Sequence, residues 1–157
     1  MKTQTQSIIT EDAIEYCTIE DIVPIVEQLE KLRPEERVDY FQDDDTFFIF
    51  WFYYYPENFE CSLAKFHFVW MYYLSCTNLN LLIEGLRGSL KTEMTKIYVI
   101  RSILYKRHKY IVWQSFASES SDEAVTNLSR MLVNGSLVLD YGQVYPFSMK
   151  KEDFSKS

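Results

Sequence analysis

One early segment of the chain carries its apolar residues at helical spacing. Ile22, Val26 and Leu29 stand three or four positions apart, and the charged residues of the segment fall on other faces. This spacing places the apolar side chains on one side of a helix. We predict a helix over 18–33 that ends at Pro34, followed by a short helix over 35–41 with that proline at or near its first position.

The middle of the chain is apolar or aromatic at nearly every position, without a helical period. Residues 46–55 read TFFIFWFYYY, and residues 61–74 form a second run of this kind after the break at Pro56. β-Branched and aromatic residues are enriched in strands. Since both faces of each run are apolar, we predict two antiparallel strands in a sheet covered by helices on both sides.

Two further helices are predicted in the second half of the chain. Leucines and isoleucine mark an apolar stripe over 77–90, with Thr77 or Asn78 as the N-cap. A similar stripe over 121–132 precedes Asn134 and Gly135, a pair that favours a left-handed helix end.

Other segments are strand-like by composition. They are 7–16, 110–113, and a closing hairpin formed by 136–139 and 143–149. For 97–100 two interpretations stay open, because its composition favours a strand while its spacing continues a helical stripe.

These elements predict an α/β fold, in the α+β sense: one domain over 1–157 with a central mixed, mostly antiparallel sheet flanked by helices. A chain of 157 residues that is 47% hydrophobic and 25% charged has the length and composition of a single globular domain. Residues 150–157 are polar, and we expect them to form a frayed tail.

Charge is unevenly distributed along the chain. Residues 1–60 hold four basic and fifteen acidic residues, and the rest holds twelve basic and eight acidic ones, for a net charge of −7. This balance argues against nucleic-acid binding, which requires a positive surface. An acidic N-terminal region instead suits a basic protein partner.

Nothing in the sequence indicates metal chemistry or a membrane span. The cysteines and histidines are few and widely spaced: Cys17, Cys61, Cys76, His67 and His108. A structural zinc site needs closely paired ligands, and an odd cysteine count without a signal peptide fits a reducing cytoplasm. Polar side chains interrupt the uncharged stretch over 66–83, so we expect a soluble, cytoplasmic protein without a bound metal.

Three stretches carry a resemblance to a known superfamily. EYCTIEDIVPIVEQLEKL, 15–32, looks like a first strand that leads into a helix, and GQVYPFSMKKEDF, 142–154, looks like a closing strand. Between them, MLVNG, 131–135, stands where a helix end precedes that strand. With the predicted order of elements, these stretches resemble the Gcn5-related N-acetyltransferase (GNAT) superfamily.

The resemblance implies an acetyl-CoA site over 72–80, YYLSCTNLN, at the splayed end of a strand. The N–H groups at a helix N-terminus attract phosphate, and a backbone that can come close to the pyrophosphate of the coenzyme favours its binding there. The implied cofactor-binding residues are Tyr73, Leu74, Ser75, Thr77, Asn78 and Asn80. The superfamily's Arg/Gln-x-x-Gly-x-Gly/Ala signature is absent, and Met131 stands near the place of its usual tyrosine acid. The resemblance therefore implies a degenerate acetyl-CoA site. Two alternatives stay open: the protein still transfers an acetyl group, or it has lost this activity.

Catalytic residues are not identified by any motif. Glu60 and Glu84 are conceivable general bases, although their spacing does not distinguish them from surface glutamates. The cationic cluster at 106–109, KRHK, is either a solvated loop or a site for the adenosine phosphate of coenzyme A.

Two functional hypotheses follow. The first is a GNAT-like acyltransferase domain, catalytic or degenerate, that binds acetyl-CoA. The second is a small acidic protein-binding factor, such as an inhibitor, an immunity-type factor or a phage accessory protein. In that case Asp43, Asp44 and Asp45 would help to dock a basic partner.

Overall fold

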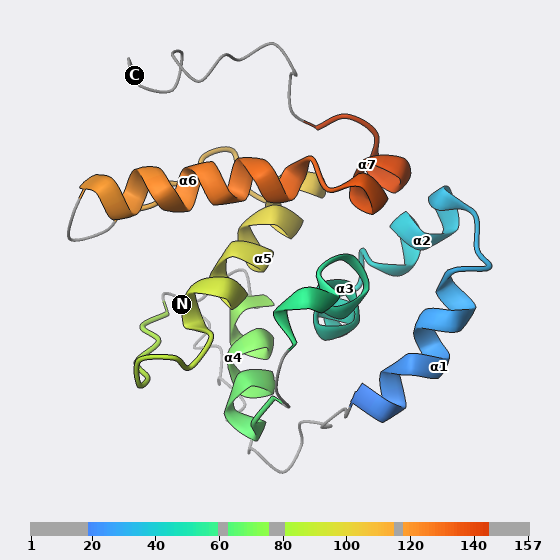
Figure 1. Cartoon of the computed structure of the whole chain (residues 1–157), viewed down its shortest axis with the longest axis horizontal. Coiled ribbons are helices and arrows are strands. Elements are labelled where there is room, and N and C mark those ends of the chain that lie inside the picture. The colour runs from blue at the N-terminus through green and yellow to red at the C-terminus, as the bar shows by residue number, and fades with distance from the viewer. Residues whose placement is uncertain (1–18, 60–62, 76–80, 115–117, 145–157) are drawn as a thin grey trace, which may run out of the picture.

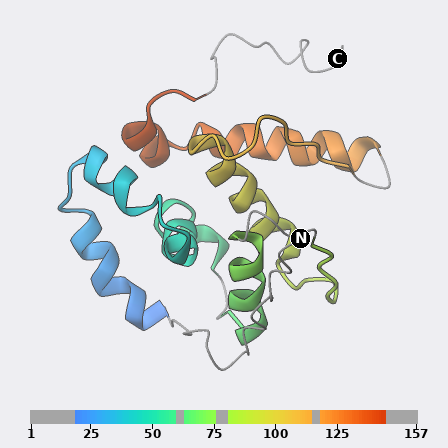
Figure 2. The ribbon, with the colours of Figure 1, turned by 180° about the vertical axis from the view of Figure 1, so that it is seen from behind.

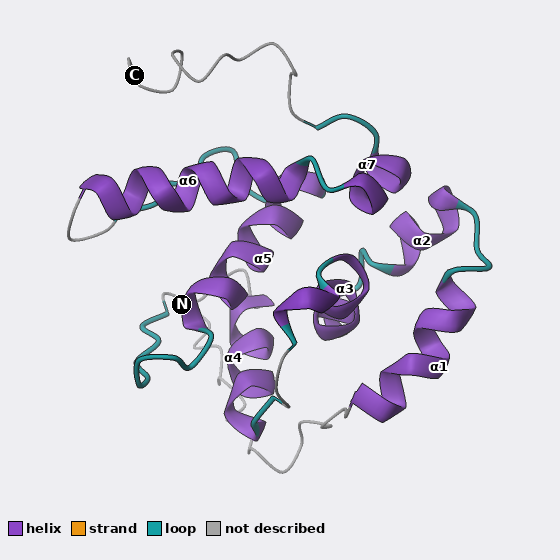
Figure 3. Cartoon of the chain, in the orientation of Figure 1, coloured by secondary structure: helices purple, strands orange, loops and turns teal. Residues whose placement is uncertain are grey.

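The computed structural model describes residues 19–59, 63–75, 81–114 and 118–144. Across these ranges the regular elements are all helical, and Figure 3 shows no strand among them. In chain order they are α1 (Ile19–Leu29), α2 (Pro34–Tyr40), the 3-10 helix η2 (Asp44–Thr46), α3 (Phe47–Tyr54), the 3-10 helix η3 (Pro56–Asn58), α4 (Lys65–Ser75), α5 (Lys91–Leu104), α6 (Ser118–Leu132) and α7 (Gly135–Tyr141). The predicted α/β fold with a central sheet is therefore wrong for the described chain.

Helix α3 lies near the middle of the molecule (Figure 1). It contacts α1 on one side and α4 on the other, and α4 in turn contacts α5. Helix α6 runs across one end, where it contacts α5, and α7 turns back to contact α2. Figure 2, which shows the molecule from behind, gives the same arrangement of neighbouring helices. The contact between α2 and α7 joins an early and a late part of the chain.

The run predicted as the first aromatic strand, 46–55, forms the end of η2 and then α3. Its buried residues lie toward one side of the helix: Phe47, Phe48, Phe50, Trp51 and Tyr54. The other side is also apolar or aromatic and is half-buried, so the helix has the same all-apolar pattern as a strand buried on both faces, and periodicity cannot separate the two. Local preference is worth tenths of a kcal/mol per residue, whereas burial of an aromatic side chain is worth about 2 kcal/mol. Tertiary packing therefore decides this segment.

The second predicted strand, 61–74, corresponds to α4 where it is described. His67 accepts a hydrogen bond at Nδ1 from the backbone N–H of Ala64 (2.9 Å), which satisfies a donor at the start of the helix. Its Nε2–H then faces the carbonyl of Ser89 at 3.2 Å. His67 thus has a structural role at this helix start, and Phe68 and Met71 point into the core.

The helix predicted over 77–90 is wrong over its described part, because residues 81–90 form a loop. Gly88 adopts a φ of +83°, and Gly85 lies so close to Trp70 that a Cβ would come within 2.7 Å of its ring. The Nζ of Lys91 donates hydrogen bonds to the carbonyls of Gly85 (2.5 Å) and Leu86 (2.9 Å). These bonds replace the helical ones, and the loop presents part of the predicted stripe to solvent.

The segment over 97–100 lies inside α5, so the helical interpretation is confirmed. The strand predicted over 110–113 is wrong, because this segment is a loop. The predicted closing hairpin is wrong over 136–139, which lies in α7. Asn134 is not a left-handed helix end: its side chain accepts a hydrogen bond from the N–H of Ser136 (3.0 Å) and so caps the start of α7.

Three helix predictions are confirmed. The first two helices appear as α1 and α2, with Pro34 as the first residue of α2, and the helix predicted over 121–132 appears as α6. The segments 7–16 and 145–149, the tail at 150–157 and all three cysteines lie outside the described residues. Among the described helices, none combines the length and the apolar character that crossing a bilayer requires.

Candidate functional site

The most distinctive surface lies on α1, α2 and η2. Ten acidic and three basic residues fall between positions 19 and 45, a formal sum of −7, which equals the net charge of the whole chain. Nine of the ten acidic residues are exposed, and we call their side chains the acidic surface: Glu20, Asp21, Glu27, Glu30, Glu35, Glu36, Asp39, Asp43 and Asp45.

Two of the three basic residues in this region have partners that limit their effect on the surface. Arg37 turns inward to the carboxylate of Asp140 on α7, and Arg33 pairs with Glu36 at the start of α2 (3.0 Å). Lys31 is exposed. Glu27, Glu30 and Asp39 form no ion pair with any described residue. Negative charge therefore dominates the exposed side chains of residues 19–45.

The predicted partner-binding aspartates lie at η2, and the structure gives them different environments. Asp43 caps η2, since its carboxylate accepts a hydrogen bond from the N–H of Asp45 (3.2 Å). Asp43 and Asp45 are exposed, whereas Asp44 is half-buried and pairs with Arg107. Two of the three carboxylates are thus part of the acidic surface, and the third is engaged within the chain.

A buried arginine holds η2 in place. Arg101 on α5 is 1% exposed and donates through Nη2 to the carbonyls of Phe41 (2.8 Å) and Asp43 (2.7 Å). Its guanidinium also lies over the rings of Phe47 and Phe50. Burial, together with the nearby charge of Arg107, lowers the pKa of Arg101 to about 10. It remains charged at neutral pH, and it fixes the loop that carries the aspartates.

Half of the implied acetyl-CoA residues can be located. Tyr73, Leu74 and Ser75 lie in the last turn of α4, and Ser75 is buried. Thr77, Asn78 and Asn80 lie outside the described residues. Because the described chain has no sheet, it offers no splayed strand for the implied coenzyme site.

The other positions considered from the sequence are dispersed. Glu84 is exposed on the loop over 81–90, and Glu60 lies outside the described residues. In the cationic cluster, Arg107 is engaged by Asp44, and Nε2 of His108 lies 2.8 Å from the hydroxyl of Tyr98. The cluster is therefore partly tied to the rest of the fold.

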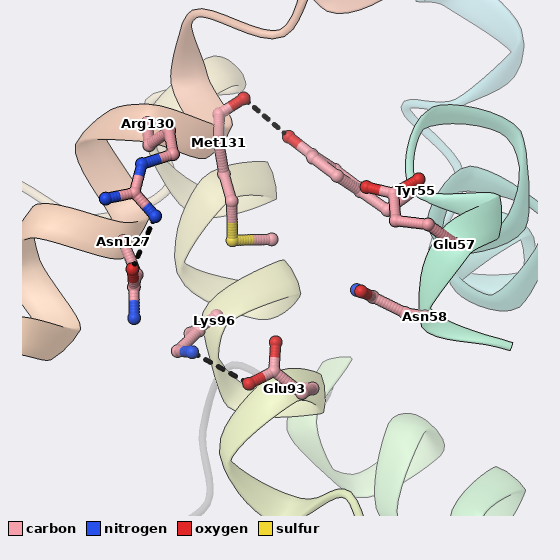
Figure 4. Close-up of a pocket in the computed structure, with 8 residues that line it drawn as sticks. All are labelled: Tyr55, Glu57, Asn58, Glu93, Lys96, Asn127, Arg130 and Met131. Atoms are coloured by element: carbon pink, nitrogen blue, oxygen red, sulfur yellow. Dashed lines mark hydrogen bonds and ion pairs between the residues drawn. The ribbon is translucent and has the colours of Figure 1, made fainter. Parts of the chain in front are cut away.

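A polar cleft that the sequence did not reveal lies between η3, α5 and α6 (Figure 4). It is open to solvent and offers about 240 Å³ of space. The cleft is lined by Tyr55, Glu57, Asn58, Glu93, Lys96, Asn127, Arg130 and Met131. Its signal in the sequence is two helical pairs at a spacing of three, Glu93 with Lys96 and Asn127 with Arg130. Their convergence requires the packing of α5 against α6.

The described residues contain no group of three or more histidine, cysteine, aspartate or glutamate side chains that could hold a metal ion. Comparisons with protein-family models, with curated proteins and with solved structures find no match for the chain.

Proposed function

We propose that this protein is a small acidic binding factor that docks a basic protein partner through the acidic surface. The observation that supports this proposal is the concentration of charge. The segment from position 19 to 45 carries a formal charge equal to that of the whole chain, and nearly all of its carboxylates are exposed.

Such a surface acts mainly on encounter and specificity. A field of one sign accelerates association with an oppositely charged partner and disfavours partners of like charge. An exposed ion pair adds only about 0.2 to 1 kcal/mol, so affinity requires several pairs formed together. Nine exposed carboxylates on three adjoining elements supply that number.

The acidic surface rests on a frame that favours a preformed partner site. Arg37 ties α2 to α7 through Asp140, and Arg101 ties η2 to α5. Side chains on rigid elements lose less conformational freedom on binding. The expected partner is a protein surface rich in lysine and arginine.

The test compares two variants with the same change in net charge. One removes three charges from the acidic surface, Glu27→Gln, Glu30→Gln and Asp39→Asn. The other removes three exposed charges from α6, Glu119→Gln, Asp122→Asn and Glu123→Gln. Binding of a short Lys-rich peptide is measured by titration calorimetry at low and moderate salt.

We expect the first variant to bind the peptide about fivefold or more weakly than the parent chain, and the α6 variant to bind it within about twofold. An equal loss in both variants would show that only total charge matters and would contradict the proposal. Circular dichroism on each variant establishes that the helices are retained.

A further inference from the structure

We propose that the cleft between η3, α5 and α6 binds a single free α-amino acid with an uncharged aliphatic side chain, in its zwitterionic form. The cleft is separate from the acidic surface, and none of its lining residues belongs to that surface. This inference therefore stands independently of the proposed function.

Lys96 forms the most buried charged part of the cleft. Its side chain is only 9% exposed, and its Nζ donates to Oε1 of Glu93 at 2.7 Å. An ammonium group carries three N–H donors, and Glu93 is its one hydrogen-bond partner among the described residues. A buried lysine needs compensating acceptors, because removal of a charge from water is costly. A ligand carboxylate would supply them.

Opposite charges occupy different sides of the cleft (Figure 4). Arg130 lies on α6 with Asn127, whose Oδ1 accepts a hydrogen bond from Nη1 of Arg130 (3.2 Å). Glu57 lies on the opposite side, on η3, next to Asn58. On α5, between these two sides, the ammonium group of Lys96 points to the carboxylate of Glu93.

The fourth side of the cleft is fixed and largely apolar. The hydroxyl of Tyr55 donates to the backbone carbonyl of Met131 at 3.0 Å, which joins the end of α3 to α6. Tyr55 is buried, and the thioether of Met131 extends into the cleft between the polar groups. A flexible thioether next to an aromatic ring suits an aliphatic side chain of varied shape.

This arrangement selects the class of ligand. Two cations and two carboxylates give a lining with no net charge. A ligand with only a negative charge is repelled by Glu57 and Glu93, and a ligand with only a positive charge is repelled by Lys96 and Arg130. An α-amino acid carries both charges a few ångströms apart. Its carboxylate would lie between Lys96 and Arg130, and its ammonium group would face the two glutamates. An open cleft of about 240 Å³ is on the small side for ligand sites, which suits a single amino acid.

The experiment uses leucine and two analogues that each lack one of its charges. 4-Methylpentanoate lacks the ammonium group, and 3-methylbutylamine lacks the carboxylate. Each compound is titrated into the full chain, and binding is followed by calorimetry and by amide chemical shifts. We expect leucine to bind with a dissociation constant of about 1 mM or lower, and each analogue to bind at least about tenfold more weakly. Binding of either analogue as tight as that of leucine, or no binding of leucine at about 10 mM, would overturn the proposal.

Substitutions in the exposed part of the cleft locate the site. Arg130→Gln and Glu57→Gln remove one charge of each sign from exposed side chains, so the fold is expected to survive. Each should weaken leucine binding at least about threefold, while Arg87→Gln and Glu84→Gln, on the loop over 81–90, should leave it unchanged. Equal effects in the two pairs of variants would overturn the assignment of the cleft. Lys96→Met is a further variant, used only if its circular dichroism matches that of the parent chain.

Discussion

Arg37 and Asp140, which stand 103 positions apart in the chain, form a two-pronged ion pair that joins α2 to α7. Nε of Arg37 donates to Oδ2 at 2.8 Å, and Nη2 donates to Oδ1 at 2.5 Å. The hydroxyl of Tyr54 on α3 donates to the same carboxylate at 2.6 Å. Since the Asp140 side chain is 2% exposed, this group links three helices in a site from which water is largely excluded.

Removal of Asp140 should strongly destabilise the fold. Asp140→Ala leaves Arg37 and the hydroxyl of Tyr54 without their acceptor, and breaking a buried pair in this way costs about 3 to 5 kcal/mol. The exposed Asp122 on α6 serves as the control, and Asp122→Ala should change the free energy of unfolding by less than about 0.5 kcal/mol. Urea denaturation measures both variants. Similar values for the two would show that the ion pair does not hold α7 in place.

The buried tyrosines predict a loss of stability in alkali. Burial raises the pKa of Tyr54, Tyr55, Tyr105 and Tyr141 above the usual 10.0, and for Tyr54 and Tyr141 a hydrogen bond raises it further. Above about pH 10 the unfolded chain releases these protons more readily than the folded chain, so the free energy of unfolding falls as pH rises.

Arg101 opposes this trend, because its pKa is lowered in the folded state and its release of a proton near pH 10 favours folding. One such group stands against these four tyrosines and Tyr53, whose pKa burial also raises, so a net loss is expected. Urea midpoints between about pH 8 and pH 12, with tyrosinate absorbance recorded in parallel, test the balance. Ionisation of every tyrosine near pH 10 with the helices retained would contradict the full burial of Tyr54 and Tyr55 and the partial burial of Tyr105 and Tyr141.

The contact between Gly85 and Trp70 predicts a difference between two glycines. A Cβ at Gly85 would lie 2.7 Å from the ring of Trp70, so Gly85→Ala must displace that ring or the loop, at a cost of about 1 to 2 kcal/mol. Gly135 has no atom within 4 Å of an added Cβ and begins a helix, so Gly135→Ala should be neutral or slightly stabilising. Thermal unfolding and tryptophan fluorescence distinguish the two. If the Gly85→Ala and Gly135→Ala variants were equally stable, the loop over 81–90 could not lie against α4.

The aspartates at η2 predict separate effects on association and on stability. The double variant Asp43→Asn and Asp45→Asn removes two exposed charges, so association with a Lys-rich peptide should slow about twofold or more at low salt and be unaffected at high salt. Asp44→Asn removes the partner of Arg107 and should act mainly on stability. Stopped-flow mixing measures the rates, and an association rate insensitive to both salt and the double variant would count against docking at this surface.

The sequence was sufficient for the amphipathic helices. The stripe formed by Ile22, Val26 and Leu29 and the proline at 34 predicted α1 and α2, and α6 followed from the same kind of spacing. Helices α1 and α6 have one apolar face, and their period can be read directly, whereas α2 was indicated by Pro34 at its first position.

Segments buried on several faces could not be predicted in this way. Helix α3 has no polar face to reveal its period, and its aromatic composition favours a strand until it packs among other helices. The leucines over 81–90 carry a helical stripe, yet the close approach of Gly85 to Trp70 and the bonds from Lys91 hold them in a loop. Both outcomes depend on contacts between distant segments.

The same distinction applies to the candidate sites. The acidic surface is local in sequence, so the charge count alone indicated it, and the structure added that Asp44 is engaged by Arg107. The cleft brings together residues of three elements, from Tyr55 to Met131, and no local pattern combines them. The cleft lies where α5 packs against α6. It can be located only once 97–100 is known to be part of a helix.

The most direct test of the central claim is a map of amide chemical shifts in the full chain during titration with a short Lys-rich peptide. If the acidic surface docks basic partners, the largest changes will fall on α1, α2 and η2, and α6 will change little although it also carries exposed acidic residues. Changes of equal size on α6, or changes scattered over all helices, would contradict docking at the acidic surface.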